Sequence, residues 1–557
     1  MKYAEMTDPV RGNSEPARYW STTNVAEATP DILSPLCWSV WGDGLERAWL
    51  TSMYEFGVLA KSELAMAEDM NRRSTASIYG RQAANVDLLR AVLARLPGVK
   101  PDEVERDLLG SVRPDTRQEP GTPARAPIVL VKFPIAMLRL DGRMQRMYDE
   151  QRTWWRREVY DVSRKGSAPT GSPLERLRSA ADRFAVAMTL HAMVRFLLPA
   201  AEGAVHSAAQ SAGASELAAP ALQGWGNVAE TEMAERLWRV GRGEVTVEDF
   251  LAEYAFHGPN EGNVYTRSWR EQPERVEGLV ASYRGRSDVA RPLDREAATM
   301  AAREEAERQL LRALPRRKRP VVSFMLRRSA GLIRKLEMGK AAYLMALDGA
   351  RAAARVVGAE LVEAGRLDEI DDAFFLTIPE LESLFADSTV DVRPLIAYRR
   401  GERERYADMI LPVSFTGMPT VTAAPNGDLR RTEIAGKAWG GCRVEGRARL
   451  VLNAADDIEL CQGDILVCRF TDPSWAPLMS LAEALVIDIG SQSSHGAVVA
   501  RELGIPYVIG TDDGTRIIKE GDRIVVDGTT GTVVILDAGD VPKVDLAVSK
   551  QMRSAEG

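Results

Sequence analysis

The spacing of apolar residues changes late in this chain, and that change constrains the fold more than any other feature. From residue 46 to about residue 411, apolar residues recur at intervals of three and four in stretches rich in Ala, Leu, Glu and Arg, which predicts a large, mostly α body. From residue 446 onward, short β-rich runs alternate with Gly-Asp turns and brief helical pieces, which predicts a compact α/β unit. The sequence therefore predicts a multidomain protein in which a small α/β domain follows a large helical one.

We place the helical domain at residues 1–417, a linker at 418–434, the α/β domain at 435–540 and a flexible tail at 541–557. The linker contains two prolines and an Asn-Gly pair, which is typical of a tether between domains. In the α/β domain we expect strands at 448–452, 465–470, 484–489, 507–509, 523–526 and 532–536, with helices near 475–482 and 495–503.

Composition excludes several classes of protein. The chain has 557 residues, too many for one hydrophobic core, and its net charge of −7 provides no basic field to gather nucleic acid. The basic run at 316–319 has no interleaved aromatic residues, so we expect a solvated segment joining helices.

Four cysteines without close pairing predict reduced thiols and no metal site. The first residues carry no signal segment, and charged residues and a proline interrupt the apolar stretch 184–205, so we expect a cytoplasmic protein without a membrane segment.

The segment GSQSSHGA contains the residue with the clearest chemical role, His495. It follows the apolar run 485–489 and precedes an expected helix, so the imidazole would lie at a helix N-terminus, where free N–H groups and the helix dipole favour a phosphoryl group. The dipole also favours the neutral, nucleophilic imidazole. Ser493 and Ser494 can cap the helix and donate hydrogen bonds to phosphoryl oxygens. The alternative is that His495, like many lone histidines, is an ordinary residue at a helix N-terminus whose ring packs or caps the helix.

The run SSHGAVVARELGIPYVIGT resembles the phosphohistidine segment of the phosphoenolpyruvate-utilising (PEP-utilising) and dikinase-like enzymes, whose swivelling domain carries phosphate on a histidine. Residues 444–448, 463–467 and 471–478 also resemble that domain, so the resemblance spans essentially all of 435 to 537. It implies that the α/β domain is a swivelling phosphohistidine domain and that His495 is its catalytic carrier. The family usually has a second glycine where this chain has Ser491.

The helical body resembles the substrate-binding domain of the rifampicin phosphotransferases. Three segments carry the likeness, at 24–39, 250–261 and 367–377, and together they cover most of 20 to 410. The fold class implied is a large, mostly α substrate-binding domain followed by the phosphohistidine domain. The His-Arg-Gly of that family is here Phe256-His257-Gly258, so its first two residues are replaced.

No GxxxxGK[ST] loop and no GxGxxG after a strand occur, and we find no segment for an ATP-grasp domain or a pyruvate-binding barrel. This organisation resembles the histidine-bearing subunit of the phenylphosphate synthases and the related alkylphenol phosphate synthases. The resemblance implies that a separate ATP-grasp subunit binds most of the ATP and Mg²⁺, and that phosphohistidine is the covalent intermediate. ATP, a phenol and water would then give aryl phosphate, AMP and phosphate.

Two clusters in the helical body are candidates for the acceptor site. His257 or Glu261 is a candidate general base for a weakly acidic phenol, and the neighbouring Asn260 and Tyr265 are candidate substrate-binding residues. Plain loop chemistry around a Gly-Pro-Asn turn is the alternative. Trp38 fits an aromatic pocket, although tryptophans in a helical body also form core.

The second cluster lies on one face of a predicted helix and resembles the Arg-x-x-Glu pattern of the substrate domain. Arg334 and Lys340 would neutralise a transferring phosphoryl group, and Glu337 would contact the substrate. An exposed helix with three-residue ion pairs is the alternative.

The function that these patterns favour is a phosphotransferase subunit that phosphorylates a small hydrophobic phenol or alcohol from His495. A split rifamycin-type antibiotic phosphotransferase is the second hypothesis, and a non-catalytic phosphohistidine relay protein is the third. The sequence leaves open the acceptor, the general base, the oligomeric state and whether the intermediate is phospho- or pyrophosphohistidine.

Overall fold

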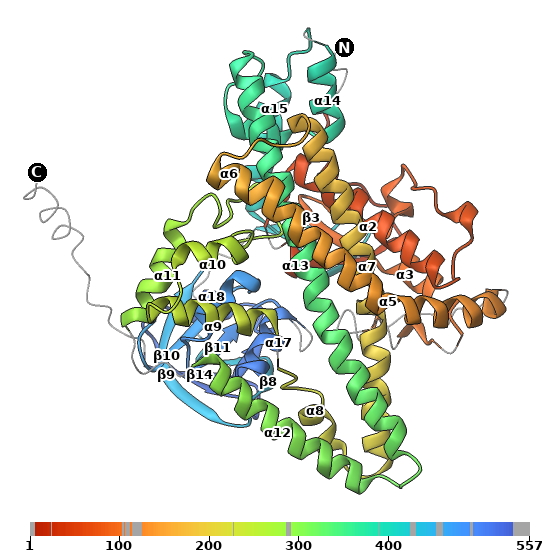
Figure 1. The fold of residues 1–557 in the computed structure, drawn as a ribbon, viewed down its shortest axis with the longest axis vertical. Coiled ribbons are helices and arrows are strands. Elements are labelled where there is room, and N and C mark those ends of the chain that lie inside the picture. The colour runs from red at the N-terminus through yellow and green to blue at the C-terminus, as the bar shows by residue number, and fades with distance from the viewer. Residues whose placement is uncertain are drawn as a thin grey trace, which may run out of the picture.

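The computed structural model has a long helical body with an α/β domain packed on one side (Figure 1). It describes residues 6–23, 25–29, 31–97, 99–102, 105, 112–113, 125–226, 228–285, 291–387, 389–423, 431–452, 460–490 and 494–537. The expected tail lies outside the described residues, and so do residues 424–430 of the expected linker.

Two long helices, α7 (Pro173–Ser211) and α13 (Arg319–Glu363), pack along each other in opposite directions and form the spine of the body (Figure 1). A capping box between Ser172 and Glu175 begins α7, because each side chain satisfies a backbone N–H that the first turn leaves free. After α13, Gly365 adopts a φ of +67° and ends the helix.

Helix α7 contains the apolar stretch 184–205. Among the described residues it is the one helix long and apolar enough to cross a membrane. Of its most apolar 18-residue segment, 61% is buried inside the protein. The sequence indicated a buried core helix here, and the packing of α7 against α13 and α2 (Pro35–Glu55) agrees with that interpretation.

The other helices surround this spine. They are α1 (Val25–Ala28), α3 (Val86–Leu93), α5 (Ala126–Trp155), α6 (Asp161–Lys165), α8 (Ala218–Ala221), α9 (Ala229–Gly241), α10 (Val247–Tyr254), α11 (Glu274–Gly285), α12 (Pro292–Ala313), α14 (Ile378–Ala386) and α15 (Arg393–Ala407).

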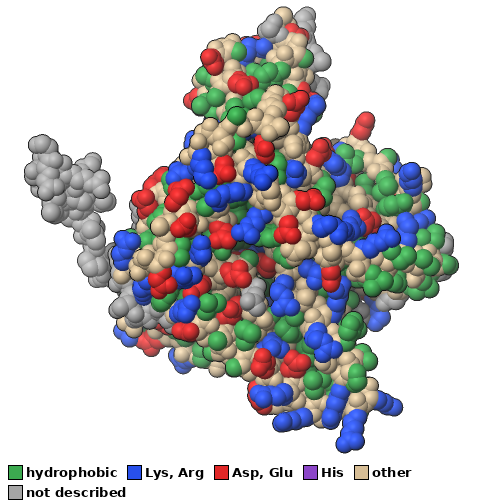
Figure 2. Space-filling view, in the orientation of Figure 1, with side chains coloured by type: hydrophobic (Ala, Val, Ile, Leu, Met, Phe, Trp, Pro, Cys, Tyr) green, Lys and Arg blue, Asp and Glu red, His purple; other side chains and the backbone are tan. Residues whose placement is uncertain are grey.

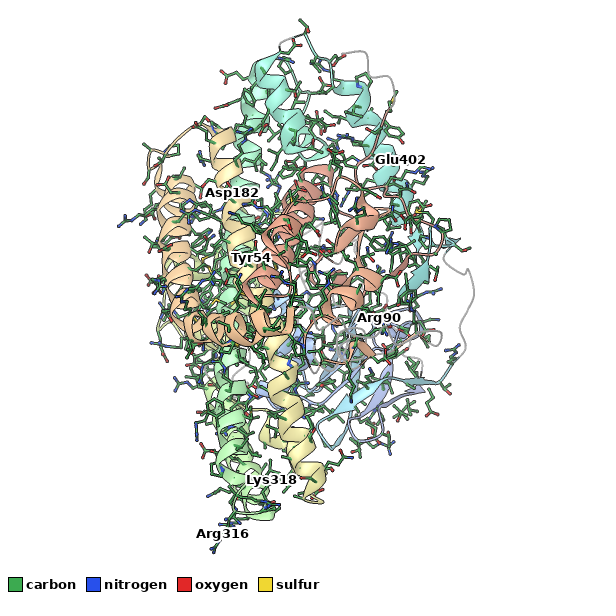
Figure 3. All side chains as sticks on the ribbon, turned by 90° about the vertical axis from the view of Figure 1, so that its right-hand side faces the viewer. Tyr54, Arg90, Asp182, Arg316, Lys318 and Glu402 are labelled. Atoms are coloured by element: carbon green, nitrogen blue, oxygen red, sulfur yellow. The ribbon has the colours of Figure 1, made fainter. Side chains whose placement is uncertain are left out.

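The basic run joins α12 to α13 at the tip of a projecting arm. Arg316 and Arg317 are exposed, and Figure 3 shows Arg316 and Lys318 at the far end of the arm. Lys and Arg side chains gather at this tip in the space-filling view (Figure 2). The sequence-based interpretation of a solvated segment joining helices is confirmed.

The helical body also contains a small antiparallel sheet that the sequence did not predict. Its strand order is β2-β3-β1-β5, with β1 (Tyr19–Ser21), β2 (Thr75–Ile78), β3 (Arg81–Asn85) and β5 (Ser414–Thr416). Tyr79 and Gly80 form the β2–β3 turn with positive φ angles of 47° and 72°, which suits a two-residue hairpin. These strands are too short and too separated in sequence to give a clear alternating pattern.

Part of the expected linker is strand. A two-stranded sheet pairs β4 (Met409–Ile410) with β6 (Thr422–Ala423), and β7 (Glu433–Ala435) already belongs to the sheet of the α/β domain.

The α/β domain is built on an eight-stranded sheet with the order β7-β14-β13-β9-β10-β11-β12-β8. Strands β9 (Arg443–Val451), β10 (Asp464–Cys468), β11 (Ala484–Ile487) and β12 (Tyr507–Ile509) are parallel. Strands β7, β8 (Lys437–Trp439), β13 (Arg523–Asp527) and β14 (Thr532–Asp537) pair antiparallel. The structure confirms the six expected strands and helices at α16 (Ala476–Met479) and α17 (His495–Glu502), whereas β7 and β8 were missed.

Both faces of the parallel strands are buried. Leu466 and Leu485 belong to an apolar cluster continuous with the helical body, whereas Ile465 and Val486 belong to a separate cluster on the opposite face. Because side chains alternate across a strand, each strand contributes to both clusters. One core therefore extends across the boundary between the two domains.

Polar contacts hold the α/β domain against α9, α11 and α12. The Glu502 carboxylate accepts hydrogen bonds from the backbone N–H groups of Gly224 (3.0 Å) and Trp225 (3.4 Å). The Tyr283 hydroxyl donates to the Pro477 carbonyl at 2.7 Å, and the Trp439 indole donates to Gln223 Oε1 at 2.6 Å. These groups join segments far apart in sequence and position the domain on the body.

We expect Glu502→Ala to loosen this docking. Loss of the buried carboxylate leaves the Gly224 and Trp225 N–H groups without their acceptor, so both amides should exchange with deuterium about tenfold faster. Glu520→Ala is a matched control, because the Glu520 carboxylate accepts from Leu450 N–H within the α/β domain. Equal exchange at residues 224 and 225 in both variants would show that Glu502 does not hold the interface.

Candidate functional site

His495 is the first residue of α17 and follows the segment after β11. The strand-to-helix junction expected from the sequence is present, and the side chain is only 9% exposed. Ser494 occupies the N-cap position, but its hydroxyl makes no capping hydrogen bond and is buried without a hydrogen-bond partner. The expected cap by Ser494 is therefore wrong, and Ser493 lies outside the described residues.

The His495 ring faces a carboxylate and an ammonium group of the helical body. His495 Nε2 lies 3.2 Å from Glu230 Oε1 on α9, and the same oxygen lies 3.5 Å from Lys340 Nζ on α13. Burial, and then the Lys340 cation, lower the pKa of His495 to about 4, although Glu230 opposes this shift. The imidazole is thus neutral near pH 7, which is the form that attacks phosphorus.

Glu230 and Glu337 line one cavity together with Lys340, and each carboxyl group shifts the pKa of the other. Burial alone would raise the pKa of Glu230, but Lys340 and His495 outweigh it and hold that pKa well below its ordinary value. Burial, and then the charge of Glu230, raise the pKa of Glu337 well above its ordinary value. The two pKa values are therefore shifted in opposite directions, so Glu230 holds the negative charge more readily and Glu337 holds a proton more readily.

A second buried pair lies nearby. His257 Nδ1 and Glu261 Oε2 are joined by a 2.7 Å hydrogen bond. Burial lowers the pKa of His257 to about 4, so its imidazole is neutral near pH 7, and burial raises the pKa of Glu261 well above its ordinary value. Asp472 of the α/β domain approaches this segment and accepts a hydrogen bond from Asn260 N–H at 3.0 Å.

Two cavities meet at Glu337 and Lys340. The first, of about 170 Å³, lies between α7, α13 and the α/β domain, and its lining includes His191, Arg195, Glu261, Tyr343, Asp472 and His495. The second, of about 130 Å³, lies between α5, α9, α10 and α13, and its lining includes Tyr148, Glu230, Met233, Phe256, His257 and Met345. The histidine of one domain therefore faces a partly apolar hollow in the other.

The structure brings together most of the residues that the sequence singled out. His495, His257, Glu261, Glu337 and Lys340 all line one of the two cavities. Asn260 borders the site through its backbone N–H group.

Three predicted residues lie elsewhere, so their expected roles are not supported by position. Arg334 is exposed and lines neither cavity, because residues three apart are offset by about 60° around the helix axis. The Tyr265 ring packs edge-on against Phe374, under the Arg403 guanidinium. Trp38 is buried on α2 and lines a different surface pocket.

Four residues of the site were not predicted as such: Glu230, Asp472, His191 and Arg195. His191 and Arg195 are polar residues one turn apart within the apolar stretch of α7. That placement could have marked them as candidate site residues. Asp472 lies within TDPSWAPL, which was noted only as a resemblance. Nothing in the local sequence distinguishes Glu230 from the other acidic residues of α9.

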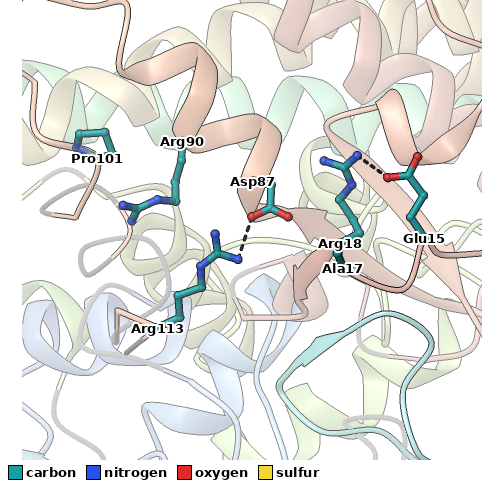
Figure 4. A pocket seen from close by; sticks show the side chains of 7 residues that line it. All are labelled: Glu15, Ala17, Arg18, Asp87, Arg90, Pro101 and Arg113. Carbon is teal, nitrogen blue, oxygen red and sulfur yellow. Dashed lines mark hydrogen bonds and ion pairs between the residues drawn. The ribbon is translucent and has the colours of Figure 1, made fainter. Parts of the chain in front are cut away.

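Another pocket, lined by three arginines, is chemically unsuited to an anion (Figure 4). Arg18 pairs with Glu15 at 2.7 Å and Arg113 pairs with Asp87 at 2.8 Å. Arg90 pairs with Asp102 at 2.5 Å. Since a carboxylate pairs with each of these three guanidinium groups, the described lining residues of this pocket offer no unpaired positive charge for phosphate.

No group of three or more His, Cys, Asp or Glu side chains among the described residues is arranged to hold a metal ion. The four cysteines are free thiols, as the sequence predicted.

Two protein-family models match parts of the chain. Residues 460–531 match the family described as PEP-utilising enzyme, mobile domain, and residues 244–336 match the rifampicin phosphotransferase fourth domain. The α/β domain matches the PEP-utilising mobile domain. This mobile domain contains His495, and the fourth-domain match contains His257, Glu261 and Arg334.

Curated relatives share parts of the chain. Rifampicin phosphotransferase of Bacillus subtilis is 38% identical over 181 residues, which are 32% of this chain and 20% of the relative. That of Streptomyces sviceus is 33% identical over 300 residues, or 52% of this chain and 34% of the relative. The prodigiosin synthesizing transferase PigC of Serratia marcescens is 42% identical over 113 residues, covering 20% and 13%. The chain thus matches at most about a third of the length of these relatives.

A solved structure titled as Enzyme I covers 64% of this chain and 87% of that chain at 14% identity. Its TM-score of 0.15 is too low for any argument about the fold. The chain is thus similar over part of its length to proteins named rifampicin phosphotransferase, and residues 460–531 match a PEP-utilising mobile domain.

We expect Lys340→Met to raise the pKa of His495 above about 4, because the ammonium group disfavours protonation of the ring. An NMR pH titration can follow this histidine directly, since the chain has only four. Lys335→Met is the control, because Lys335 lies on α13 like Lys340 but pairs with Asp141 of α5. A His495 pKa that moves equally in both variants, or in neither, would contradict the direct influence of Lys340.

Asp472 predicts a pH dependence of domain stability. Burial, and then the charge of Glu261, raise its pKa to about 7, so the docked protein favours the protonated carboxyl. This contribution is complete below the ordinary pKa of about 3.9 and is lost as the pH rises through 7.

Scanning calorimetry from about pH 5 to about pH 8 should therefore show a steeper fall in Tm for the unmodified chain than for Asp472→Asn, which cannot ionise. Asp512→Asn is the control variant, because Asp512 lies in an exposed turn of the same domain. Parallel curves for the unmodified chain and Asp472→Asn would rule out this contribution.

Proposed function

We propose that this chain transfers a phosphoryl group from phosphorylated His495 to the hydroxyl of a small hydrophobic acceptor, a phenol, and that a separate ATP-grasp subunit binds ATP and Mg²⁺. The observation that carries the proposal is the position of His495. Its ring lies at the wall of a cavity in the helical body, 3.2 Å from Glu230 and beside Lys340. A carrier histidine and an acceptor cavity therefore already adjoin.

The lining of the second cavity suits an aromatic acceptor. Met233, Phe256 and Met345 supply apolar and aromatic surface, while His257 supplies a hydrogen-bonding group. Pockets of this kind bind small molecules through apolar contacts and a few fixed polar groups. A phenol could place its ring against these side chains and direct its hydroxyl toward Lys340.

The cavity sizes favour a small acceptor. The two hollows measure about 170 and 130 Å³, whereas pockets for drug-sized ligands are typically about 300–1,000 Å³. A single aromatic ring is therefore a better match for the docked arrangement than a macrocyclic antibiotic.

The residues present can perform each part of the transfer. Lys340 would neutralise charge on the phosphoryl group as the bond from His495 nitrogen to phosphorus breaks and the bond from acceptor oxygen to phosphorus forms. The electron pair of the broken bond returns to the imidazole. His257, neutral near pH 7 and oriented by Glu261, is the proposed acceptor of the hydroxyl proton.

Recharging requires His495 to leave the cavity, because the ring is buried in the docked position. We therefore propose that the mobile domain swivels between this chain's acceptor cavity and the ATP of the partner subunit. ATP and Mg²⁺ would supply the phosphoryl group there. The docking groups around Glu502 and Tyr283 would be made and broken in each cycle.

A rifamycin-type acceptor is the second candidate. The names of the relatives from Bacillus subtilis and Streptomyces sviceus favour it. This function would require the helical body to open well beyond the hollows of the docked structure.

The test charges the histidine chemically and so needs no partner. Phosphoramidate should phosphorylate the unmodified chain, and added phenol or a 4-alkylphenol should then give an aryl phosphate detectable by ³¹P NMR. His495→Ala should give none. His257→Asn should become charged normally but transfer about 10²–10⁴-fold more slowly, which is the usual contribution of a general base.

The alternatives give different products. Phosphorylation of rifamycin but not of phenols would replace the first function with the second. A chain that is charged on His495 but transfers to no small acceptor would favour a relay protein. Labelling that persists in His495→Ala would overturn the assignment of the carrier histidine.

A further inference from the structure

Glu230 occupies an unusual position for a carboxylate. Its Oε1 lies 3.2 Å from His495 Nε2 and 3.5 Å from Lys340 Nζ, so one oxygen contacts both the histidine and a cation. The residue is only 3% exposed. Its second oxygen, Oε2, is buried without a hydrogen-bond partner of standard geometry.

A phosphoryl group on His495 Nε2 would compete for the same space. The phosphorus would be bonded to Nε2, and its oxygens would project toward the body, where Glu230 Oε1 now lies. Two anions cannot share a buried position without a large electrostatic cost. Lys340 can neutralise only one of them at a time.

We propose that the Glu230 carboxylate is an internal substitute for the phosphoryl group: it fills the position between His495 and Lys340 in the uncharged protein and withdraws when phosphorylated His495 docks. This inference rests on the proposed function, in which His495 carries the phosphoryl group. Glu230 forms and breaks no covalent bond and acts as a positioning residue.

Glu337 provides a place for the displaced carboxylate. It lies on α13 and lines the same cavity as Glu230, and burial together with the charge of Glu230 raises its pKa well above the ordinary value, which favours the protonated form. Glu230 can therefore give up Lys340 and still keep a hydrogen-bond donor for its charge. Without such a donor, a buried carboxylate separated from its cation would be strongly destabilised.

The substitute has two consequences for the reaction. In the uncharged protein it denies Lys340 to inorganic phosphate, which would otherwise occupy the site. After transfer, Glu230 can return to Lys340 and compete with the phosphate of the product, which favours product release. The same contact holds the uncharged His495 ring at the cavity.

Inorganic phosphate is the probe that tests this inference, with binding to the uncharged full chain measured by titration calorimetry. Glu230→Gln should bind phosphate at least about tenfold more tightly than the unmodified chain, because Lys340 loses its internal anion. Adding Lys340→Met to Glu230→Gln should abolish the gain. Glu244→Gln, which removes an exposed carboxylate paired with Arg239, is the matched control and should leave phosphate affinity unchanged.

Each outcome decides the inference. Equal phosphate affinity in Glu230→Gln and the unmodified chain would overturn it, and so would a gain that survives Lys340→Met. If Glu230→Gln does not fold, Glu230→Asp keeps the charge on a shorter side chain that cannot reach both His495 and Lys340, and a smaller gain in affinity is expected.

The proposed function is tested separately by phosphoramidate charging. If His495 is charged and transfers its phosphoryl group, but Glu230→Gln gains no affinity for phosphate, only this inference is overturned. A gain with no transfer to any acceptor would instead remove the function and leave an anion site at Lys340.

Discussion

The burial of His495 against Glu230 and Lys340 is the contact on which the rest of this structure depends. It places a titratable group of the mobile domain inside the helical body, where desolvation and the ammonium group keep the ring neutral. A neutral imidazole next to a cation is suited to exchanging a phosphoryl group rather than a proton. The docking surface, the cavities and the carboxyl pair can take part in group transfer only because the His495 ring lies among them.

Burying so many ionisable groups costs free energy of folding, and pairing between the groups reduces this cost. Burial and the charge of Glu230 raise the pKa of Glu337, and Glu261, whose pKa burial raises, is hydrogen-bonded to the neutral His257. An isolated buried charge would destabilise the fold by several kcal/mol, so pairing and protonation are what make the cluster possible. Burial, and then the charge of Glu261, likewise raise the pKa of Asp472 to about 7.

Much of the architecture could be predicted from local pattern. Six strands and two helices of the mobile domain follow from alternating or continuous apolar runs bounded by Gly-Asp turns, which are local signals. The sheet joining β1 to β5 was missed because its pairing links residues 19–21 to 414–416. The helix containing Arg334 and Lys340 was foreseen, but which of its residues face the cavity depends on the partners of α13.

The sequence by itself determined the two-part organisation, the helix start at His495 and the family resemblance of both parts, because those features rest on neighbours along the chain. Only the tertiary structure decided that Glu230 meets His495, that Arg334 points to solvent and that Trp38 and Tyr265 lie away from the site. Those outcomes depend on how the mobile domain docks on α9 and α13. Docking is a long-range balance of apolar burial and hydrogen bonding, and no short stretch of sequence encodes it.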